Sequence, residues 1–470
     1  MRRLLFIALF ILSTANASAT AYFISPTGND GNAGTSSGSP WLSPNHAVNC
    51  GDTITAAAGT YSSANFVDGK WGTVTCSAGN NVAWLICVTF DACKISSSSN
   101  HAMKVTNSYW GVQGWETTTT GTGNGCFSVQ PPNSSTSLHH IIFANDVANT
   151  CSGGGFNIFF NGSAGVDYLV AVGNIAYNSA TGSGECFSAF SINTPAKHDS
   201  LSGTHVYFAG NFAWANVDPN PCAGTAPTDG EGIIFDTINA NSYNQQMVAY
   251  NNLFIGNGGR CIQPYDSTSG APIYVEYNTC YGNETDLNQT PGGSLGELRV
   301  ENATNVTAYY NIAQTTMANG PQSHPLYAYY VITGNSTDLL DYSWLYSAAG
   351  NNCGVQAPAG GFVCGTHSLT GTSATFSNPT IPGAPSCGST ASVPACMSTV
   401  ISHFTPTASG STVYGYQIPL GHSITDPLFP SWLCNVNLPS GLVTLGCGAP
   451  PTLGSSVGAT VGVAGKTSVQ

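Results

Sequence analysis

The sequence predicts an all-β chain folded as a parallel β-solenoid, and three observations lead to this prediction. Glycine, serine, threonine and asparagine are spread along the whole chain, and only 7% of the residues are charged. No convincing amphipathic helix is found, which favours an extended β architecture with many turns. A strand-like motif that ends in asparagine recurs six times, as in proteins built from stacked repeats.

The N-terminal sequence is typical of a secretory signal peptide. It reads MRRLLFIALFILSTANASA, with a basic pair, an apolar core and a small-residue end. The apolar run is too short for a lasting anchor, and no later stretch approaches the roughly 20 apolar residues that span a bilayer. We therefore expect a signal peptide over residues 1–19, a secreted or periplasmic location, and no membrane span.

Six strand-like runs end in asparagine, and equivalent asparagines of a solenoid can stack on one another. The runs end at Asn145, Asn174, Asn211, Asn252, Asn278 and Asn311. In five of them a second asparagine follows, at Asn149, Asn178, Asn216, Asn257 and Asn283. Stacking at about 4.8 Å per rung buries the apolar face of each unit and lets the asparagines hydrogen-bond in ladders. The alternative is a β-sandwich whose strands end in asparagine by coincidence.

A second strand follows each asparagine turn, and its alignment sets the register of the charged residues. The aligned segments are GGGFNIFF, GECFSAF, GEGIIFD, GRCIQPYD and GELRVEN. Their predicted inward residues are Phe156, Phe187, Ile233, Ile262 and Leu298. The same alignment places Glu185, Glu231 and Arg260 at one position on three successive rungs.

Sixteen cysteines follow the signal peptide, and none forms a C-x-x-C motif. This usage indicates an oxidising compartment and disulfides rather than a zinc site. The close candidate pairs are Cys353/Cys364, Cys387/Cys396 and Cys434/Cys447. Cys126, Cys186 and Cys261 share one place just before a core residue of the repeat. Packing and disulfides both fit this column, and we favour packing.

Motifs at the start and in the middle of the mature chain carry a family resemblance. At the start they are Ser25-Pro26, Gly28, Asp30, Gly34-Thr35, Pro40-Trp41, GDT at 51–53 and GTY at 59–61. In the middle they are DGEGIIFD, NNLFIGNGGRCIQPYD and YNTCYGN. Over about residues 21–315 the chain resembles right-handed parallel β-helix proteins of the pectate-lyase-like superfamily, which implies that fold. Lyases, hydrolases, epimerases and phage tailspikes share the scaffold, so the resemblance does not select a substrate.

We expect three regions: the signal peptide (1–19), the parallel β-helix (20–345) and a C-terminal segment (346–470). The C-terminal segment is rich in cysteine, glycine, serine and proline, and its only charged residues are Asp426 and Lys466. It can therefore supply little acid–base chemistry. We expect a disulfide-rich, loop-rich segment that packs on the β-helix or caps it.

The charge balance limits the partners. The chain has 9 lysines and arginines against 22 aspartates and glutamates, a formal net charge of −13. Removal of Arg2 and Arg3 with the signal peptide shifts this charge from −13 to −15. Such a balance disfavours nucleic acid and anionic lipid as partners, because like charges repel. An acidic substrate would need a cation between itself and the protein.

The candidate site lies where the remaining charge concentrates. Glutamates on adjacent rungs, as predicted for Glu185 and Glu231, would repel each other by roughly 3 to 4 kcal/mol. A proton, a bound cation or the guanidinium of Arg260 could relieve this repulsion, and each is a useful catalytic device. A purely structural ion-pair ladder, Glu231 with Arg260 and Arg299 with Glu301, is the competing interpretation.

The resemblance implies a calcium-assisted polysaccharide lyase that cleaves a uronate-containing glycan, such as a polyuronate, by β-elimination. Similar lyases use a lysine or arginine base above a calcium ion, and no lysine lies nearby in this chain. The predicted catalytic residues are Arg260, Glu231 and Glu185. The predicted calcium ligands are Asp229, Glu231 and Asp236. The predicted substrate-binding residues are Arg299, Tyr265 and Trp214.

Two other functions stay open. A glycoside hydrolase would use Glu185, Glu231 or Asp236 as a pair of carboxyl groups, whose separation decides between retention and inversion. A non-catalytic glycan-binding or surface protein would use the same wall without chemistry. In each case we expect a monomer whose partner is a polysaccharide.

Overall fold

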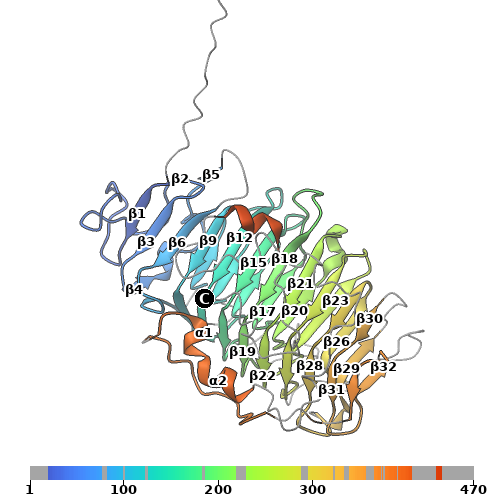
Figure 1. Ribbon diagram of the computed structural model, residues 1–470. Coiled ribbons are helices and arrows are strands. Elements are labelled where there is room, and N and C mark those ends of the chain that lie inside the picture. Colours follow the sequence, from blue (N-terminus) through green and yellow to red (C-terminus); the bar gives the residue numbers. More distant parts are fainter. Residues whose placement is uncertain are drawn as a thin grey trace, which may run out of the picture.

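The structure is a computed structural model, shown in Figure 1. It describes residues 19–76, 82–98, 101–121, 125–182, 186–218, 229–286, 295–320, 323–332, 338–355, 365–371, 373, 376–388, 390–404 and 430–436. Residues 1–18 of the predicted signal peptide lie outside these ranges, as do Glu185, Cys364 and Cys447. In the described part of the chain, no helix is long and apolar enough to cross a membrane.

The chain is a right-handed parallel β-helix, as predicted, with three long sheets of 11, 11 and 9 strands. The first sheet contains β1 (Ala21–Ile24), β3 (Thr53–Ala56), β6 (Ala83–Cys87), β9 (Trp110–Gln113), β12 (Leu138–Ala144), β15 (Val166–Val172), β18 (Thr204–Ala209), β21 (Gln246–Tyr250), β24 (Ile273–Glu276), β27 (Val306–Tyr309) and β30 (Leu339–Asp341). The second contains β4 (Gly59–Ser62), β7 (Cys93–Ser97), β10 (Trp115–Thr119), β13 (Val147–Cys151), β16 (Ile175–Tyr177), β19 (Phe212–Trp214), β22 (Leu253–Ile255), β25 (Thr279–Tyr281), β28 (Ile312–Gln314), β31 (Trp344–Tyr346) and β33 (Leu369–Thr370). The third contains β8 (Met103–Val105), β11 (Phe127–Val129), β14 (Phe156–Ile158), β17 (Phe190–Asn193), β20 (Ile233–Asp236), β23 (Ile262–Ser267), β26 (Leu295–Ala303), β29 (Leu326–Ile332) and β32 (Cys353–Val355).

The remaining elements are short. A two-stranded sheet joins β2 (Val48–Asn49) to β5 (Val74–Thr75), and 3₁₀ turns span Ser63–Asn65, Ile238–Asn241 and Ser431–Asn435. The α-helices are α1 (Val393–Cys396) and α2 (Ser398–His403). Every strand of the three long sheets pairs in parallel with the equivalent strand of the next rung, so each turn of the chain adds one layer to the core.

The inward column of the third sheet shows the register. Phe127, Phe156, Phe190, Ile233, Ile262 and Leu298 pair in succession. The rings of Phe127 and Phe156 stack with their centroids 4.7 Å apart, and those of Phe156 and Phe190 4.8 Å apart. Phe187 was the predicted member of this column, and that prediction is wrong by three residues, because Phe190 is the residue that pairs with Ile233.

The first asparagine ladder forms as predicted over five rungs. Its members are Asn174, Asn211, Asn252, Asn278 and Asn311. At each step the backbone N–H and the side-chain amide of one asparagine donate to Oδ1 of the next; for Asn211 and Asn252 the distances are 2.9 and 3.0 Å. Asn145 is not a member, because Asp146 holds this place and its N–H donates to Oδ1 of Asn174.

A second ladder lies at the bend between the second and third sheets. The N–H of Ser179 donates to Asn216, and the ladder continues through Asn257 and Asn283. Asn283 then donates to both carboxylate oxygens of Glu297. The prediction for Asn178 is thus wrong by one residue. Asn149 is not in the ladder either, because its amide donates to Glu116 on the outer face of the second sheet.

The cysteine column forms disulfides, so our preference for packing was wrong. Cys126 bonds to Cys151 and Cys261 to Cys280, with Cα atoms 5.7 and 5.6 Å apart. Cys186 is also disulfide-bonded. These bonds tie the start of a third-sheet strand to the second sheet, at distances that a disulfide readily spans. Further bridges join Cys50 to Cys76, Cys87 to Cys93 and, as predicted, Cys387 to Cys396. Cys353 is disulfide-bonded as well.

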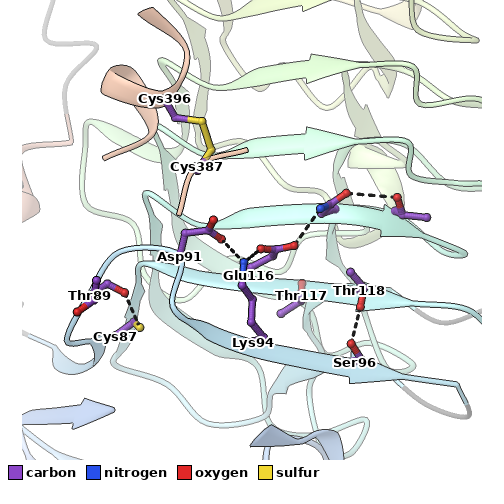
Figure 2. Close-up of polar contacts among 12 residues, drawn as sticks. Cys87, Thr89, Asp91, Lys94, Ser96, Glu116, Thr117, Thr118, Cys387 and Cys396 are labelled. Carbon is purple, nitrogen blue, oxygen red and sulfur yellow. Dashed lines mark hydrogen bonds and ion pairs between the residues drawn. A yellow bond between two sulfur atoms is a disulfide. The ribbon is translucent and has the colours of Figure 1, made fainter. Parts of the chain in front are cut away.

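Residues 376–404, which we call the C-terminal arm, pack on the outer face of the second sheet. Val393, Met397 and Phe404 join an apolar cluster with Phe212, Leu253, Ile312 and Trp344. In Figure 1 the orange helices α1 and α2 lie along this side of the β-helix. Figure 2 shows that the Cys387–Cys396 disulfide of the arm lies near the ion pairs of Lys94 with Asp91 and Glu116. Trp432 and its neighbours pack separately on the first sheet.

Candidate functional site

Glu231 and Arg260 meet at the bend that leads into the third sheet, just before β20 and β23. Nη1 of Arg260 lies 3.0 Å from Oε1 of Glu231, and Nε lies 3.6 Å from Oε1 of Glu284. The two side chains of the closer pair are 0% and 2% exposed for Glu231 and Arg260. Burial lowers the pKa of Arg260, but the carboxylates of Glu284 and Glu231 outweigh it and raise the pKa above its ordinary value. The predicted ion pair therefore exists, and it is buried.

The sequence alignment predicted Glu185, Glu231 and Arg260 at one position on three successive rungs. In the structure Ser188, and not a glutamate, lies beside Glu231 at this position. Because Phe190 pairs with Ile233, Ser188 is level with Glu231, and its hydroxyl donates to Oε2 of Glu231 over 2.6 Å. Glu185, which we predicted for this position, lies outside the described residues. The expected repulsion between two glutamates on adjacent rungs is thus replaced by a hydrogen bond.

The predicted calcium ligands do not converge on one point. Among the described residues, the one group of three side chains with close ligand atoms is Cys261, Cys280 and Glu297, and its two sulfurs are joined in a disulfide. Both oxygens of Glu231 are occupied by Arg260 and Ser188. Asp229 is half-buried, and burial, followed by the charge of Glu231, raises its pKa well above the ordinary value. The arrangement of Asp229, Glu231 and Asp236 does not fit a calcium ion, and we propose no catalytic step that uses one.

Two other predicted residues, Asp236 and Tyr265, do come together with Glu301, on the outer face of the third sheet. Tyr265 pairs with Glu301, and Phe235 pairs with Pro264, which places Asp236 on the rung next to Tyr265. Asp236, Tyr265 and Glu301 therefore form an outward column on β20, β23 and β26, because alternate residues of a strand face the same side. Tyr265 is 36% exposed, Asp236 is half-buried, and Glu301 has a side-chain exposure of 25%.

The two carboxyl groups of this column have different surroundings. Oε2 of Glu301 accepts from Nη2 of Arg299 over 2.8 Å and from Nε2 of Gln263 over 3.0 Å. Asp236 accepts from the amide of Asn193 over 2.5 Å and from the hydroxyl of Thr237 over 2.8 Å. Burial is the main cause that raises the pKa of Asp236 to about 6, and the negative charges of Glu231 and Asp266 add to it.

Arg299 lies on β26 two residues before Glu301, so it faces the same side of the sheet, and it is 7% exposed. Burial, followed by the positive charge of Arg260, lowers its pKa to about 10. Its Nε is buried without a hydrogen-bond partner in the described structure. The terminal nitrogen Nη2 of Arg299 holds Glu301.

Trp214 does not belong to this face. It lies on β19 in the second sheet, is 1% exposed, and donates its indole N–H to the carbonyl of Gly383 over 3.1 Å. Because the C-terminal arm covers it, the predicted stacking of Trp214 on a sugar ring is wrong.

Three polar residues of the face were not among the predicted site residues: Glu301, Gln263 and Asn193. Glu301 was predicted only as an ion-pair partner of Arg299. The signal for all three is the alternation of outward positions along β17, β23 and β26. This signal is readable once the correct register of the third sheet is known.

Comparison with known proteins adds a likeness of fold. No protein-family model and no curated protein matches the chain. Among solved structures, the pectate lyase Pel9A is 16% identical over 77% of this chain and 80% of that chain, with a TM-score of 0.39. The A-module of the mannuronan C-5 epimerase AlgE6 from Azotobacter vinelandii is 14% identical over 68% and 71%, with a TM-score of 0.37. The GH136 lacto-N-biosidase from Eubacterium ramulus is 12% identical over 75% and 68%, with a TM-score of 0.41. At such values the likeness carries no argument about the chemistry of this chain.

Proposed function

We propose that the protein is an exported carbohydrate-active enzyme that hydrolyses a glycan on the outer face of the third sheet. The observation that carries this proposal is the column in which Asp236 and Glu301 flank the exposed ring of Tyr265. Asp236 is the proton donor to the leaving oxygen, and Glu301 is the base that activates water.

The separation of the two carboxyl groups supports inversion. Asp236 and Glu301 are two rungs apart, which corresponds to about 9.6 Å between their strands. Inverting glycosidases hold their carboxyl groups roughly 6.5–9.5 Å apart to leave room for a water molecule. The spacing of their strands therefore lies at the upper end of this range.

The surroundings of the two groups support the assignment of roles. A general acid must hold a proton near its working pH, and the pKa of about 6 gives Asp236 this property. Glu301 is oriented by two donors, Arg299 and Gln263, toward the face on which water could approach. The phenol ring of Tyr265, between them, offers an apolar surface for a sugar ring.

A β-eliminating lyase is the second candidate, and one observation favours it. The guanidinium of Arg299 lies in the same face, and its pKa of about 10 brings it closer to the range of a useful base. For this lyase, calcium is supported only by the sequence-based prediction, because the predicted ligands Asp229, Glu231 and Asp236 do not converge on one point. Arg260 and Glu231 have no part in either proposal, since their burial leaves no contact surface for a polymer.

The proposal is tested by Asp236→Asn and Glu301→Gln, with Glu276→Gln on the first sheet as the matched control. We expect wild-type protein to release new reducing ends from a glycan without the ultraviolet absorbance of an unsaturated product. Each site variant should lose at least 100-fold in rate, in line with the roughly 10²–10⁴-fold contribution of a general acid or base. Unsaturated ends would identify the lyase, and full activity of both site variants would contradict the assignment of the site.

Export is proposed on the signal-like N-terminus and on the five disulfides described above, which are typical of an oxidising compartment. N-terminal sequencing of the protein recovered outside the cytoplasm should find a start near residue 20. A mature protein that retains Met1 would contradict this.

A further inference from the structure

We infer that the glycan bound at this face is uncharged, and that a polyuronate is excluded from it. The inference rests on the proposed function, since it concerns the substrate of the same site. It follows from the small supply of lysines and arginines in the chain and from where those of the described residues lie.

The sequence leaves very few cations for the third sheet. After the signal peptide the chain has seven basic residues, namely Lys70, Lys94, Lys104, Lys197, Arg260, Arg299 and Lys466. The segments 219–228 and 287–294, which precede β20 and β26 in the chain, contain no lysine or arginine. No conformation of these segments can therefore bring a further cation of this kind to the site.

Among the described residues, the cations on or next to the strands of the third sheet are paired, and Lys197 is exposed in the loop that follows β17. Nη2 of Arg299 lies 2.8 Å from Glu301, and Nζ of Lys104 lies 2.8 Å from Asp68. Arg260 is buried against Glu231 and Glu284. Lys94 lies on the second sheet, paired with Asp91 and Glu116, as Figure 2 shows. A row of uronates, with one carboxylate on each sugar, would find Lys70 and Lys197 as the only lysines or arginines without an ion pair among the described residues, too few for a chain of acidic sugars.

The face itself carries negative charge. Asp236, Glu301 and Asp266 lie on β20, β26 and β23, and Asp266 is held by the amides of Asn239 and Asn302. Glu301 is neutralised by Arg299, but a carboxylate on a bound sugar would be repelled by Asp266 and, above about pH 6, by Asp236. A bridging calcium ion would need converging ligands, and Asp229, Glu231 and Asp236 do not provide them.

The uncharged groups of the face suit a neutral sugar. Asn193 and Gln263 offer amide groups on either side of Asp236 and Tyr265, and both are already oriented by a carboxylate. Sugar hydroxyls can donate to and accept from such groups, while the ring stacks on Tyr265. Recognition by hydroxyl contacts and stacking requires no charge on the glycan.

The test measures binding of two sets of probes to full-length Asp236→Asn protein, which binds without rapid turnover, and to the wild type, which keeps the carboxyl group of Asp236. The first set consists of neutral polysaccharides, namely galactan, arabinan, xylan and glucomannan. The second is polygalacturonate and alginate, each with and without calcium. Tyr265→Ala in the same background identifies binding at this face, and Tyr346→Ala on the second sheet is the control.

We expect at least one neutral polysaccharide to bind, with at least tenfold weaker binding in Tyr265→Ala and unchanged binding in Tyr346→Ala. Polyuronate binding that depends on Tyr265, with or without calcium, would overturn the inference, as would a complete lack of Tyr265-dependent binding to the neutral set. Neutral binding without any cleavage by the wild type would instead refute hydrolysis and leave the inference standing.

Discussion

At the scale of single residues, the buried acids determine how the protein responds to pH. Glu297 is 1% exposed and ends the second asparagine ladder, where its two oxygens accept from the N–H and the side-chain amide of Asn283. Burial raises its pKa to about 8 from an ordinary value of 4.5, with a further contribution from Glu284. The folded protein therefore binds this proton more tightly than the unfolded chain does.

A Glu297→Gln substitution should stabilise the protein at neutral pH. In the wild type, the protonated side chain of Glu297 contributes to the free energy of unfolding, and this contribution is lost as the pH rises from about 4.5 to about 8. Glutamine does not ionise, so the variant should not lose this contribution. At pH 7 the gain is at most about 3 kcal/mol. Urea unfolding of wild type, Glu297→Gln and the half-exposed control Glu276→Gln between pH 5 and 8 measures it. A variant whose stability follows the wild-type pH dependence would show that Glu297 is not the responsible group.

The buried pair of Arg260 and Glu231 predicts a stability defect in place of a purely catalytic one. Arg260→Met leaves the buried carboxylates of Glu231 and Glu284 without their cation, which typically costs about 3–5 kcal/mol. Arg260→Met combined with Glu231→Gln should recover part of this loss, because one uncompensated charge is removed. Thermal unfolding of the two single variants and the double variant completes the cycle. An Arg260→Met protein of wild-type stability and no activity would restore the catalytic interpretation.

At the scale of elements, the asparagine ladders connect the rungs at the bends. Oδ1 of Asn252 accepts from the N–H and the amide of Asn211, and its own amide donates to Asn278 and to the carbonyl of Phe208. These groups are buried, so each bond lost would leave a polar group without water. The ladders therefore fix the register of three sheets at once.

We expect Asn252→Ala to lower the free energy of unfolding by roughly 3–5 kcal/mol, because several buried donors and acceptors lose their partner. Asn149→Ala is the matched control, since its half-buried amide donates only to Glu116 in the described structure, and it should cost less than about 1 kcal/mol. Chemical denaturation of both variants gives the comparison. Equal losses would mean that membership of the ladder does not determine stability.

The elements also show what the sequence could and could not predict. The β-helix and most of the first ladder follow from the recurrence of strand runs that end in asparagine. The register of β17 does not, because Phe187 and Phe190 both fit an inward position, and pairing with Ile233 selects Phe190. This three-residue difference decides that Ser188, and not Glu185, accompanies Glu231. Trp214 is buried through a contact with Gly383, which is 169 residues away in the sequence, and no local sequence pattern predicts that contact.

At the scale of the whole molecule, the β-helix leaves an apolar strip that its own C-terminal arm covers. Val393 and Phe404 are 0% exposed in a cluster with outward residues of the second sheet. The Cys387–Cys396 disulfide closes a short loop in the arm just before α2. Without the arm, residues such as Phe212, Leu253 and Trp344 would form a continuous exposed strip, which in a soluble protein promotes association.

Val393→Asp should therefore detach the arm and change the state of association without unfolding the β-helix, whose sheets do not depend on this contact. A buried charge without a partner is costly, and the arm can escape this cost by leaving the surface. We expect increased binding of a hydrophobic dye and a larger mass by light scattering, with the far-ultraviolet β signal retained. Thr399→Asp, at an exposed position of α2, is the matched control and should behave as the wild type. If Val393→Asp keeps the mass of the wild type and does not bind the dye, the apolar strip must be protected by something other than the packing of this helix.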